Sequence, residues 1–171
     1  VPYQLPQLLS SIQSGGKILI LEGEKDVNRA KELGFVATTF PGGAGKWRKE
    51  YSIYFKEAEV VLIPDLDRPG IEGAHKIAFG LNGTVKSISW LHLPGLGDVK
   101  PKHGKDFFDW TELPDSTPEK LSELVDSAPI WKPMESQNSN QIEKYGGGWF
   151  RVSGNAVHYQ PPLKITKYGE V

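Results

Sequence analysis

The sequence predicts an α/β fold of about four parallel strands with helices on both faces of the sheet. Between residues 17 and 91, short apolar runs alternate with segments of helical periodicity. The runs 18–21 (Ile-Leu-Ile-Leu) and 60–63 (Val-Val-Leu-Ile) are apolar throughout, as strands buried on both faces are. Alternating strands and helices are typical of a parallel sheet, because each parallel pair needs a crossover connection.

The first half of the domain is expected to contain two strands and two helices. A strand at 17–21 precedes a helix at 24–33, whose end is marked by Gly34. The short β-branched segment 36–40 is the second strand. After a glycine-rich loop, residues 47–58 are expected to form a helix with aromatic side chains turned inward.

The second half repeats this pattern. A third strand is expected at 59–63, and Pro69 opens a helix in which apolar residues recur every three to four positions. Residues 84–91 alternate between apolar and polar and form the fourth strand. A short turn or helix at 105–110 and a capped amphipathic helix at 116–125 complete the domain.

The character of the sequence changes after residue 128. We expect a domain over residues 1–128, a polar linker over 129–145, and a β-hairpin within 146–171. Because a lone hairpin is marginally stable in water, this last part is the start of a second domain or an appended hairpin. Position 1 is Val rather than Met, so we expect a piece of a longer protein.

The composition of the chain argues against several kinds of site and partner. The 171 residues include no cysteine, which excludes disulfides and thiolate metal sites in this chain and fits a cytoplasmic protein. No apolar run approaches the roughly 20 residues that span a bilayer, so no membrane partner is expected. The net charge of −1 is low for binding DNA through bulk positive charge. Any nucleic-acid contact must therefore be a local patch.

Three acids follow the expected strands directly. Glu22 comes after the first strand, and Asp65 and Asp67 come after the third. Ligands of parallel α/β sheets bind at the carboxyl ends of strands, and residues two apart in an extended chain share a face. Converging carboxylates without nearby His or Cys favour a hard ion such as Mg²⁺. The sequence therefore predicts a metal site, with solvated loop acids as the alternative.

Two motifs around these acids resemble the signature of the Toprim domain, which bacterial primases, type IA and II topoisomerases and some nucleases share. They are Leu-Glu-Gly-Glu-Lys-Asp at 21–26 and Asp-Leu-Asp-Arg-Pro-Gly at 65–70. The runs Pro-Gly-Gly-Ala-Gly-Lys-Trp at 41–47 and Gly-Lys-Asp-Phe-Phe-Asp-Trp at 104–110 are similar to those of primase-helicase-like proteins of phages, plasmids and integrated elements. The resemblance covers roughly residues 1–127.

The resemblance implies roles for individual acids. Glu22 matches the invariant Glu of the family, proposed as general acid/base or metal contact, and Asp65 and Asp67 match its metal-binding pair. Asp106, with Asp109 as a weaker match, corresponds to the acid downstream of the last strand. The implied cofactor is Mg²⁺ or Mn²⁺, which in phosphoryl transfer neutralises developing charge.

Four basic residues are candidate nucleotide or phosphate contacts: Lys25, Lys46, Arg48 and Arg68. Backbone amides of the glycine run before Lys46 could help to hold a phosphate, although the run is not a Walker A loop and a flexible turn is the alternative. Lys25 and Arg68 lie inside the acidic motifs, where they contact phosphate or pair with the acids.

Other side chains that stand out in the sequence are expected to be solvated or to pack in the fold. The basic run with Lys100, Lys102, His103 and Lys105 is expected to be a solvated loop, with a template or nucleotide contact as the alternative. His75 is expected at the surface. Four of the five tryptophans are expected to pack rather than to stack on bases: Trp47, Trp90, Trp110 and Trp131.

Three functions compete. The first is the catalytic Toprim domain of a DNA primase or primase-helicase that makes RNA primers. Its partners would be template DNA, nucleoside triphosphates, and zinc-binding and helicase or ATPase domains elsewhere in the protein. The second is a Toprim nuclease, which would shorten strands. The third is a non-catalytic domain of a mobile-element replication protein that binds DNA or a partner.

Overall fold

The computed structural model of the chain describes residues 1–133, 142–145, 148–153 and 156–160. The chain divides into two compact units, Val1–Pro133 and Met134–Val171. The first unit contains every residue proposed above for a functional site.

Four parallel strands form the sheet of the first unit, as the sequence predicts. They are β1 (Lys17–Ile20), β2 (Ala37–Thr38), β3 (Glu59–Leu62) and β4 (Ser87–Trp90), in the order β2-β1-β3-β4. β1 and β3 pair in register, with Ile20 opposite Leu62. β2 and β4 are shorter than the expected segments 36–40 and 84–91.

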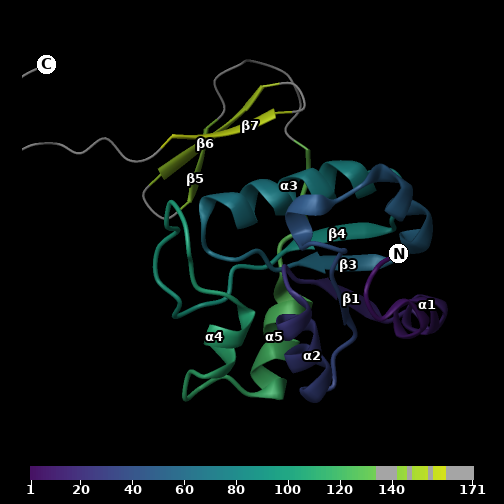
Figure 1. Cartoon of the computed structure of the whole chain (residues 1–171). Coiled ribbons are helices and arrows are strands. Elements are labelled where there is room, and N and C mark those ends of the chain that lie inside the picture. The colour runs from purple at the N-terminus through teal and green to yellow at the C-terminus, as the bar shows by residue number, and fades with distance from the viewer. Residues whose placement is uncertain (134–141, 146–147, 154–155, 161–171) are drawn as a thin grey trace, which may run out of the picture. The chain divides into compact units, whose positions relative to one another are not determined.

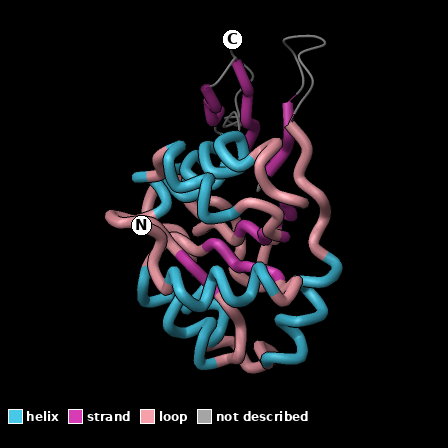
Figure 2. Tube along the Cα trace, turned by 90° about the vertical axis from the view of Figure 1, so that its right-hand side faces the viewer, coloured by secondary structure: helices cyan, strands magenta, loops and turns pink. Residues whose placement is uncertain are grey.

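Helices cover both faces of this sheet, as Figures 1 and 2 show from two directions. α3 (Arg68–Leu81) lies on one face, and α2 (Glu24–Glu32), α4 (Phe107–Thr111) and α5 (Pro118–Ser127) lie on the other. The chain moves from β1 to β2 and from β3 to β4 in opposite directions along the sheet. Right-handed crossovers in opposite directions place their helices on opposite faces. No helix in the described part of the chain is long and apolar enough to cross a membrane.

The core consists of two apolar layers that hold the strand ends in place. On one face, strand residues such as Leu19 and Val61 pack with Trp110 of α4 and are almost fully buried. On the other face, α3 buries Ile71 and Ile77. Each such side chain contributes about 1.5–3 kcal/mol on burial. The acidic loops therefore start from well-anchored strands.

Two segments differ from the expectation. Residues 47–58 do not form one α-helix but contain the short 3-10 helices η1 (Ala44–Lys46) and η2 (Lys49–Phe55). Aromatic residues are weak helix formers, and here the Tyr51 ring stacks on Phe40 with centroids 5.4 Å apart. The sequence-based prediction also misses α1 (Leu5–Gln13), although its apolar residues Leu5, Leu8, Leu9 and Ile12 recur at helical spacing.

The four tryptophans for which packing was expected do pack within the first unit. Trp47 lies against α3 at Gly80, where an added Cβ would come within 2.2 Å of its Nε1 atom. Trp90 and Trp110 are buried, and Trp131 meets the ring of Phe79 edge-on at 5.1 Å.

The expected linker over 129–145 needs correction at both ends. The Trp90 N–H donates to the Pro129 carbonyl at 2.9 Å, and the Trp131 N–H donates to the Ile88 carbonyl at 2.8 Å, so residues 129–131 extend the edge of β4. At its other end the linker contains β5 (Ile142–Tyr145). The polar stretch 134–141 lies outside the described residues.

The described residues of the second unit form an antiparallel sheet in the order β5-β6-β7. β6 (Gly148–Ser153) and β7 (Ala156–Gln160) correspond to the expected hairpin. β5 is an additional strand that pairs with β6. The expected turn at residues 154–155 is not among the described residues.

We predict that Gly80→Ala destabilises the protein, although Ala favours helix over Gly by about 1 kcal/mol. The added Cβ would displace the Trp47 ring, and overpacking of this kind costs about 1–3 kcal/mol. Urea unfolding measures the effect. Gly45→Ala is the control, because nothing lies within 4 Å of a Cβ built there. An unchanged or higher unfolding free energy for Gly80→Ala would contradict this packing.

Candidate active site

The acids that follow β1 and β3 meet where the direction of the chain through the sheet reverses. The strand order β2-β1-β3-β4 places β1 beside β3, while the chain runs outward from them in opposite directions. The loops at the carboxyl ends of such a pair diverge and leave a crevice. Glu22 lies just beyond β1, and Asp65 and Asp67 lie just beyond β3. The topology therefore brings these three predicted residues to one place.

Glu22 and Asp65 form a buried pair of carboxyl groups. Burial raises the pKa of Glu22; hydrogen bonding to Asp65 opposes this rise, and the charges of Asp67 and Asp106 add to it. Burial also raises the pKa of Asp65 from 3.8 to about 9, and the charge of Glu22 and the hydrogen bond between the two groups add to the rise. The pair therefore retains a proton at neutral pH, as two carboxylates that share a site do.

One oxygen of this pair lacks a hydrogen bond. Oε2 of Glu22 is buried, and no described residue offers it a partner. It lies against α3 at Gly70, where an added Cβ would come within 2.9 Å of it, and Glu22 borders a small void lined by Leu62 and Ile77. Leaving a buried polar atom unsatisfied costs about 1–3 kcal/mol. A hydrogen-bond donor or a cation that bound to this oxygen would therefore remove that cost.

Backbone amides hold Asp67 in position. As the N-cap of α3, it accepts the Gly70 N–H on Oδ1 at 2.9 Å, and its Oδ2 accepts the Gly104 N–H at 3.0 Å. An N-cap carboxylate also interacts favourably with the positive end of the helix dipole. Asp67 therefore has a structural role, and each of its oxygens retains a lone pair for a further partner.

Two further carboxylates lie close to these acids. Asp106 is the N-cap of α4 and accepts the Asp109 N–H at 2.7 Å. Asp26 is 5% exposed and accepts the Phe108 N–H at 3.2 Å; burial first, and then the charge of Asp106, raise its pKa. The sequence interpretation gave Asp26 no role, although its position four residues after Glu22 in the first turn of a helix could have indicated one. We call the following five residues the acid cluster: Glu22, Asp26, Asp65, Asp67 and Asp106.

The acid cluster suits a hard divalent cation by its chemistry, because every member offers carboxylate oxygens. Among the residues that the structure describes, no three His, Asp or Glu side chains converge closely enough to hold an ion as they stand. The unpartnered Oε2 of Glu22 and the raised pKa values of Glu22 and Asp65 nevertheless fit a cation that replaces the retained proton. Side chains of the cluster would have to move for binding.

The loop between β4 and α4 packs directly on the segment that carries Asp65 and Asp67. The Leu66 N–H donates to the Lys105 carbonyl at 2.8 Å, and the Lys100 N–H donates to the Leu66 carbonyl at 2.9 Å. A Cβ at Gly104 would lie 2.1 Å from the carbonyl oxygen of Leu66, so only glycine fits there. We call residues 97–105 the basic loop; backbone contacts fix it against the acid cluster.

Two of the candidate phosphate contacts, Lys25 and Arg68, lie within the acidic motifs and have partners outside these motifs. Nζ of Lys25 lies 3.7 Å from the centre of the Phe108 ring, and Arg68 forms an ion pair with Glu72 at 2.8 Å. Arg68 is thus paired with an acid of its own helix rather than with the cluster.

The other two candidates belong to the glycine-rich loop. Lys46 ends η1, and Arg48 directly precedes η2. The loop approaches the end of β1, because a Cβ at Gly43 would lie 3.4 Å from the carbonyl oxygen of Glu22. The fold therefore places this loop beside Glu22.

His75 is not the surface residue that the sequence suggested. It is 5% exposed, its ring centroid lies 4.4 Å from that of Trp90, and burial lowers its pKa to about 4. The imidazole is therefore neutral at neutral pH. His75 follows Ile71 by four residues and precedes Ala78 by three, so it lies on the apolar stripe of α3, and this spacing indicates burial.

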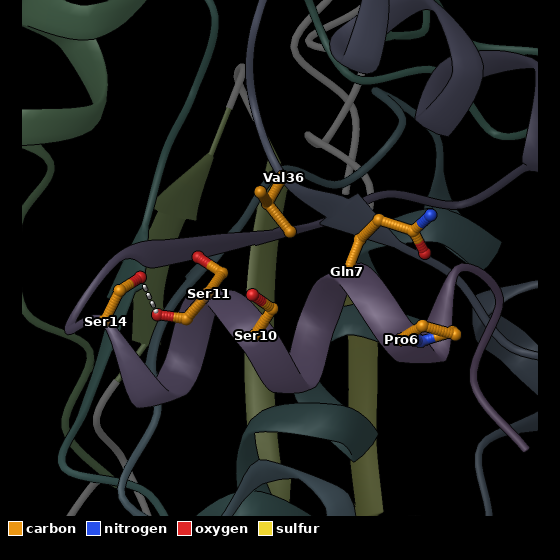
Figure 3. A pocket seen from close by; sticks show the side chains of 6 residues that line it. All are labelled: Pro6, Gln7, Ser10, Ser11, Ser14 and Val36. Atoms are coloured by element: carbon orange, nitrogen blue, oxygen red, sulfur yellow. Dashed lines mark hydrogen bonds between the residues drawn. The ribbon is translucent and has the colours of Figure 1, made fainter.

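An open hollow of about 480 Å³ lies along α1, away from this chemistry. Figure 3 shows its lining, which consists of Pro6, Gln7, Ser10, Ser11, Ser14 and Val36. None of these side chains titrates near neutral pH, and Ser14 is already engaged through its hydroxyl, which donates to the Ser11 carbonyl at 3.0 Å. The candidate site is therefore defined by the acid cluster.

We predict that metal-free protein loses stability through Asp65 as the pH rises. The folded-state pKa of Asp65 is about 9 against an ordinary 3.8, so between these values the folded state holds a proton that the unfolded state has released. Because proton binding is linked to folding, the free energy of unfolding falls as the pH rises between these two pKa values. Above the higher value it does not change further through Asp65. Asp65→Asn should therefore gain stability relative to wild type with rising pH in urea unfolding with EDTA. A constant difference would show that Asp65 ionises normally; exposed Asp115→Asn is the control.

We predict that Gly104→Ala detaches the basic loop from the acid cluster. The Cβ would collide with the Leu66 carbonyl, which is backbone and cannot rotate away, so a loss of at least about 1–3 kcal/mol is expected. Hydrogen exchange at the Leu66 and Lys100 amides should accelerate more than exchange in β1. Unchanged protection of both amides would contradict the packing described here.

The fold has a distant counterpart among solved structures. A chain from the structure of bacteriophage T7 lagging-strand DNA polymerase interacting with primase domains of two gp4 subunits, bound to an RNA/DNA hybrid and dTTP, is similar with a TM-score of 0.46 and 23% identity. The match covers 67% of this chain and 56% of that chain, so this chain spans little more than half of its length. No protein-family model and no curated protein matches the chain.

Proposed function

We propose that this chain is a Mg²⁺- or Mn²⁺-dependent phosphoryl-transfer module of the Toprim type that acts on nucleic acid. Within that class, we propose the catalytic domain of a DNA primase or primase-helicase, which makes RNA primers on a DNA template from nucleoside triphosphates. One observation carries the proposal: at the reversal point of the sheet, Glu22 and Asp65 form a buried carboxyl pair with an unpartnered oxygen.

Glu22, Asp65, Asp67 and Asp106 would hold the ion. A divalent cation bound there would neutralise charge on a reacting phosphate and orient the attacking hydroxyl. Asp67 and Asp106 are already oriented, because they accept backbone N–H groups at 2.9 and 2.7 Å. Ligands fixed before binding reduce the entropy lost when the site assembles.

Glu22 is suited to transfer a proton. Burial, its largest perturbation, raises its pKa above that of an exposed Glu. A general acid or base is most effective when its pKa lies near the working pH. The adjacent carboxyl of Asp65 can exchange a proton with Glu22, so the pair can accept a proton from an attacking hydroxyl.

The four candidate cations would offset the charge of a bound nucleotide: Lys25, Lys46, Arg48 and Arg68. Arg68 begins α3 directly after Asp67 and would have to release Glu72. This exposed ion pair contributes at most about 1 kcal/mol, so its exchange for a phosphate costs little. Lys25 is closer to the acids, since its charge lowers the pKa of Asp26 against the effect of burial.

We predict that Mg²⁺ or Mn²⁺ shifts or broadens the backbone amide NMR signals of Gly23, Leu66 and Asp106. Glu22→Gln and Asp65→Asn should each weaken binding by at least about tenfold, because loss of a ligand exceeds loss of an outer-shell partner. Neither residue caps a helix, so these variants remove charge while leaving the helix ends intact. The exposed Asp115→Asn is the matched control and should bind like wild type.

If millimolar metal moves none of these signals, the metal-dependent proposal is wrong for this chain. If metal binds, incubation with single-stranded DNA and nucleoside triphosphates separates the competing functions. New strands support the primase, and shortened strands support the nuclease. DNA binding with neither product supports the non-catalytic domain. Glu22→Gln should abolish whichever reaction occurs.

A further inference from the structure

We propose that the basic loop, residues 97–105, binds the backbone of single-stranded DNA through Lys100 and Lys102 and holds the strand beside the acid cluster. The inference rests on the proposed function and deepens it, because it gives the nucleic-acid strand a place on the molecule. It replaces the expectation that this run is only a solvated loop.

The loop has an excess of positive charge in a chain whose net charge is −1. Its three lysines, Lys100, Lys102 and Lys105, outnumber its one acid, Asp98. Lys105 is neutralised by an ion pair with Asp109 at 2.7 Å. Lys100 and Lys102 are exposed, and neither belongs to an ion pair within the described ranges. These two charges are therefore available to a ligand.

Backbone contacts fix the two lysines beside the acids. Lys100 forms a parallel β-bridge with Asp67, and its carbonyl accepts the Arg68 N–H at 2.9 Å. The Gly104 N–H donates to Oδ2 of Asp67 at 3.0 Å, so the loop is bound on both sides of Lys102. Because none of these bonds uses a lysine side chain, both ammonium groups remain free of this framework.

The conformation of the loop is constrained, which distinguishes it from an ordinary solvated loop. His103 has φ 53°, a left-handed conformation uncommon for a residue other than glycine. Gly104 is pressed against the Leu66 carbonyl, and the side chain of Val99, within the loop, is buried. Pro101 restricts the backbone between the two lysines. A loop ordered in advance loses less entropy when it binds a ligand.

The chemistry of the loop favours the phosphate backbone over the bases. Residues 97–105 include no Phe, Tyr or Trp, so the loop has no platform on which bases could stack. The acid cluster repels phosphates, and a bound cation would offset only those next to it. Neighbouring phosphates of the strand need separate cations, and Lys100 and Lys102 are adjacent to the cluster. A flexible single strand can bend to follow so short an element.

We predict that Lys100→Ala/Lys102→Ala weakens binding of fluorescein-labelled oligothymidylate to the full chain by about tenfold at low salt. The slope of log K against log salt should become shallower by about 1.4, because each lost contact to a single strand contributes about 0.7. The control is Lys31→Ala/Lys56→Ala. It removes two exposed lysines at the amino end of the sheet, near the end of α2 and just before β3. Exchanging thymidine for mixed sequence should change little.

Mn²⁺ affinity, measured on the same proteins, separates this inference from the proposed function. Weaker DNA binding with unchanged Mn²⁺ affinity in Lys100→Ala/Lys102→Ala supports the inference. If this variant binds DNA as well as the control does, the inference is overturned and the metal site stands. Absence of DNA binding by wild type at low salt also overturns it. Lysine-dependent DNA binding without metal binding keeps the loop contact and overturns the proposed function instead.

Discussion

The pairing of β1 with β3 is the constraint on which the candidate site depends. These strands are adjacent in the sheet although α2, β2 and the 3-10 segments separate them in the sequence. Because the chain leaves them in opposite directions, their carboxyl ends are left uncovered by crossover helices. Glu22 and Asp65 extend from these two ends. Shifting the register of β1 against β3 by one residue would turn one of the carboxyl groups to the opposite face of the sheet.

The acid cluster contains two kinds of carboxyl group, one that caps helices and one that retains a proton. Asp67 and Asp106 cap helices and accept hydrogen bonds from backbone N–H groups. Glu22 and Asp65 have no such donors and instead retain a proton, as the raised pKa of each group indicates. The first pair is therefore held in place by the backbone, while the second pair can change protonation state. A site that binds a cation and transfers a proton would use both kinds of carboxyl group.

The sequence predicted the sheet and the main acids because both depend on local patterns. The run 18–21 and the strand-end position of Glu22 are visible without tertiary information. α1 was missed although Leu5, Leu8, Leu9 and Ile12 recur at helical spacing, so this miss lies in the interpretation and not in the sequence. The burial of His75 was indicated by its spacing on α3 but not recognised, whereas the contact of Asp26 with α4 comes from a distant part of the chain. A contact such as that of Asp26 with the Phe108 N–H leaves no periodic signal in the sequence.

The double role of the capping acids limits what their substitution can show. Removing Asp67 would release the first turn of α3 and the Gly104 amide that ties the basic loop. Removing Asp106 would release the capping box of α4, and with it the segment whose Phe108 amide holds Asp26. Loss of function in either case would fit a structural cause as well as a chemical one. Glu22 and Asp65 cap no helix. Loss of function in Glu22→Gln or Asp65→Asn would therefore indicate a chemical role and not a loss of local structure.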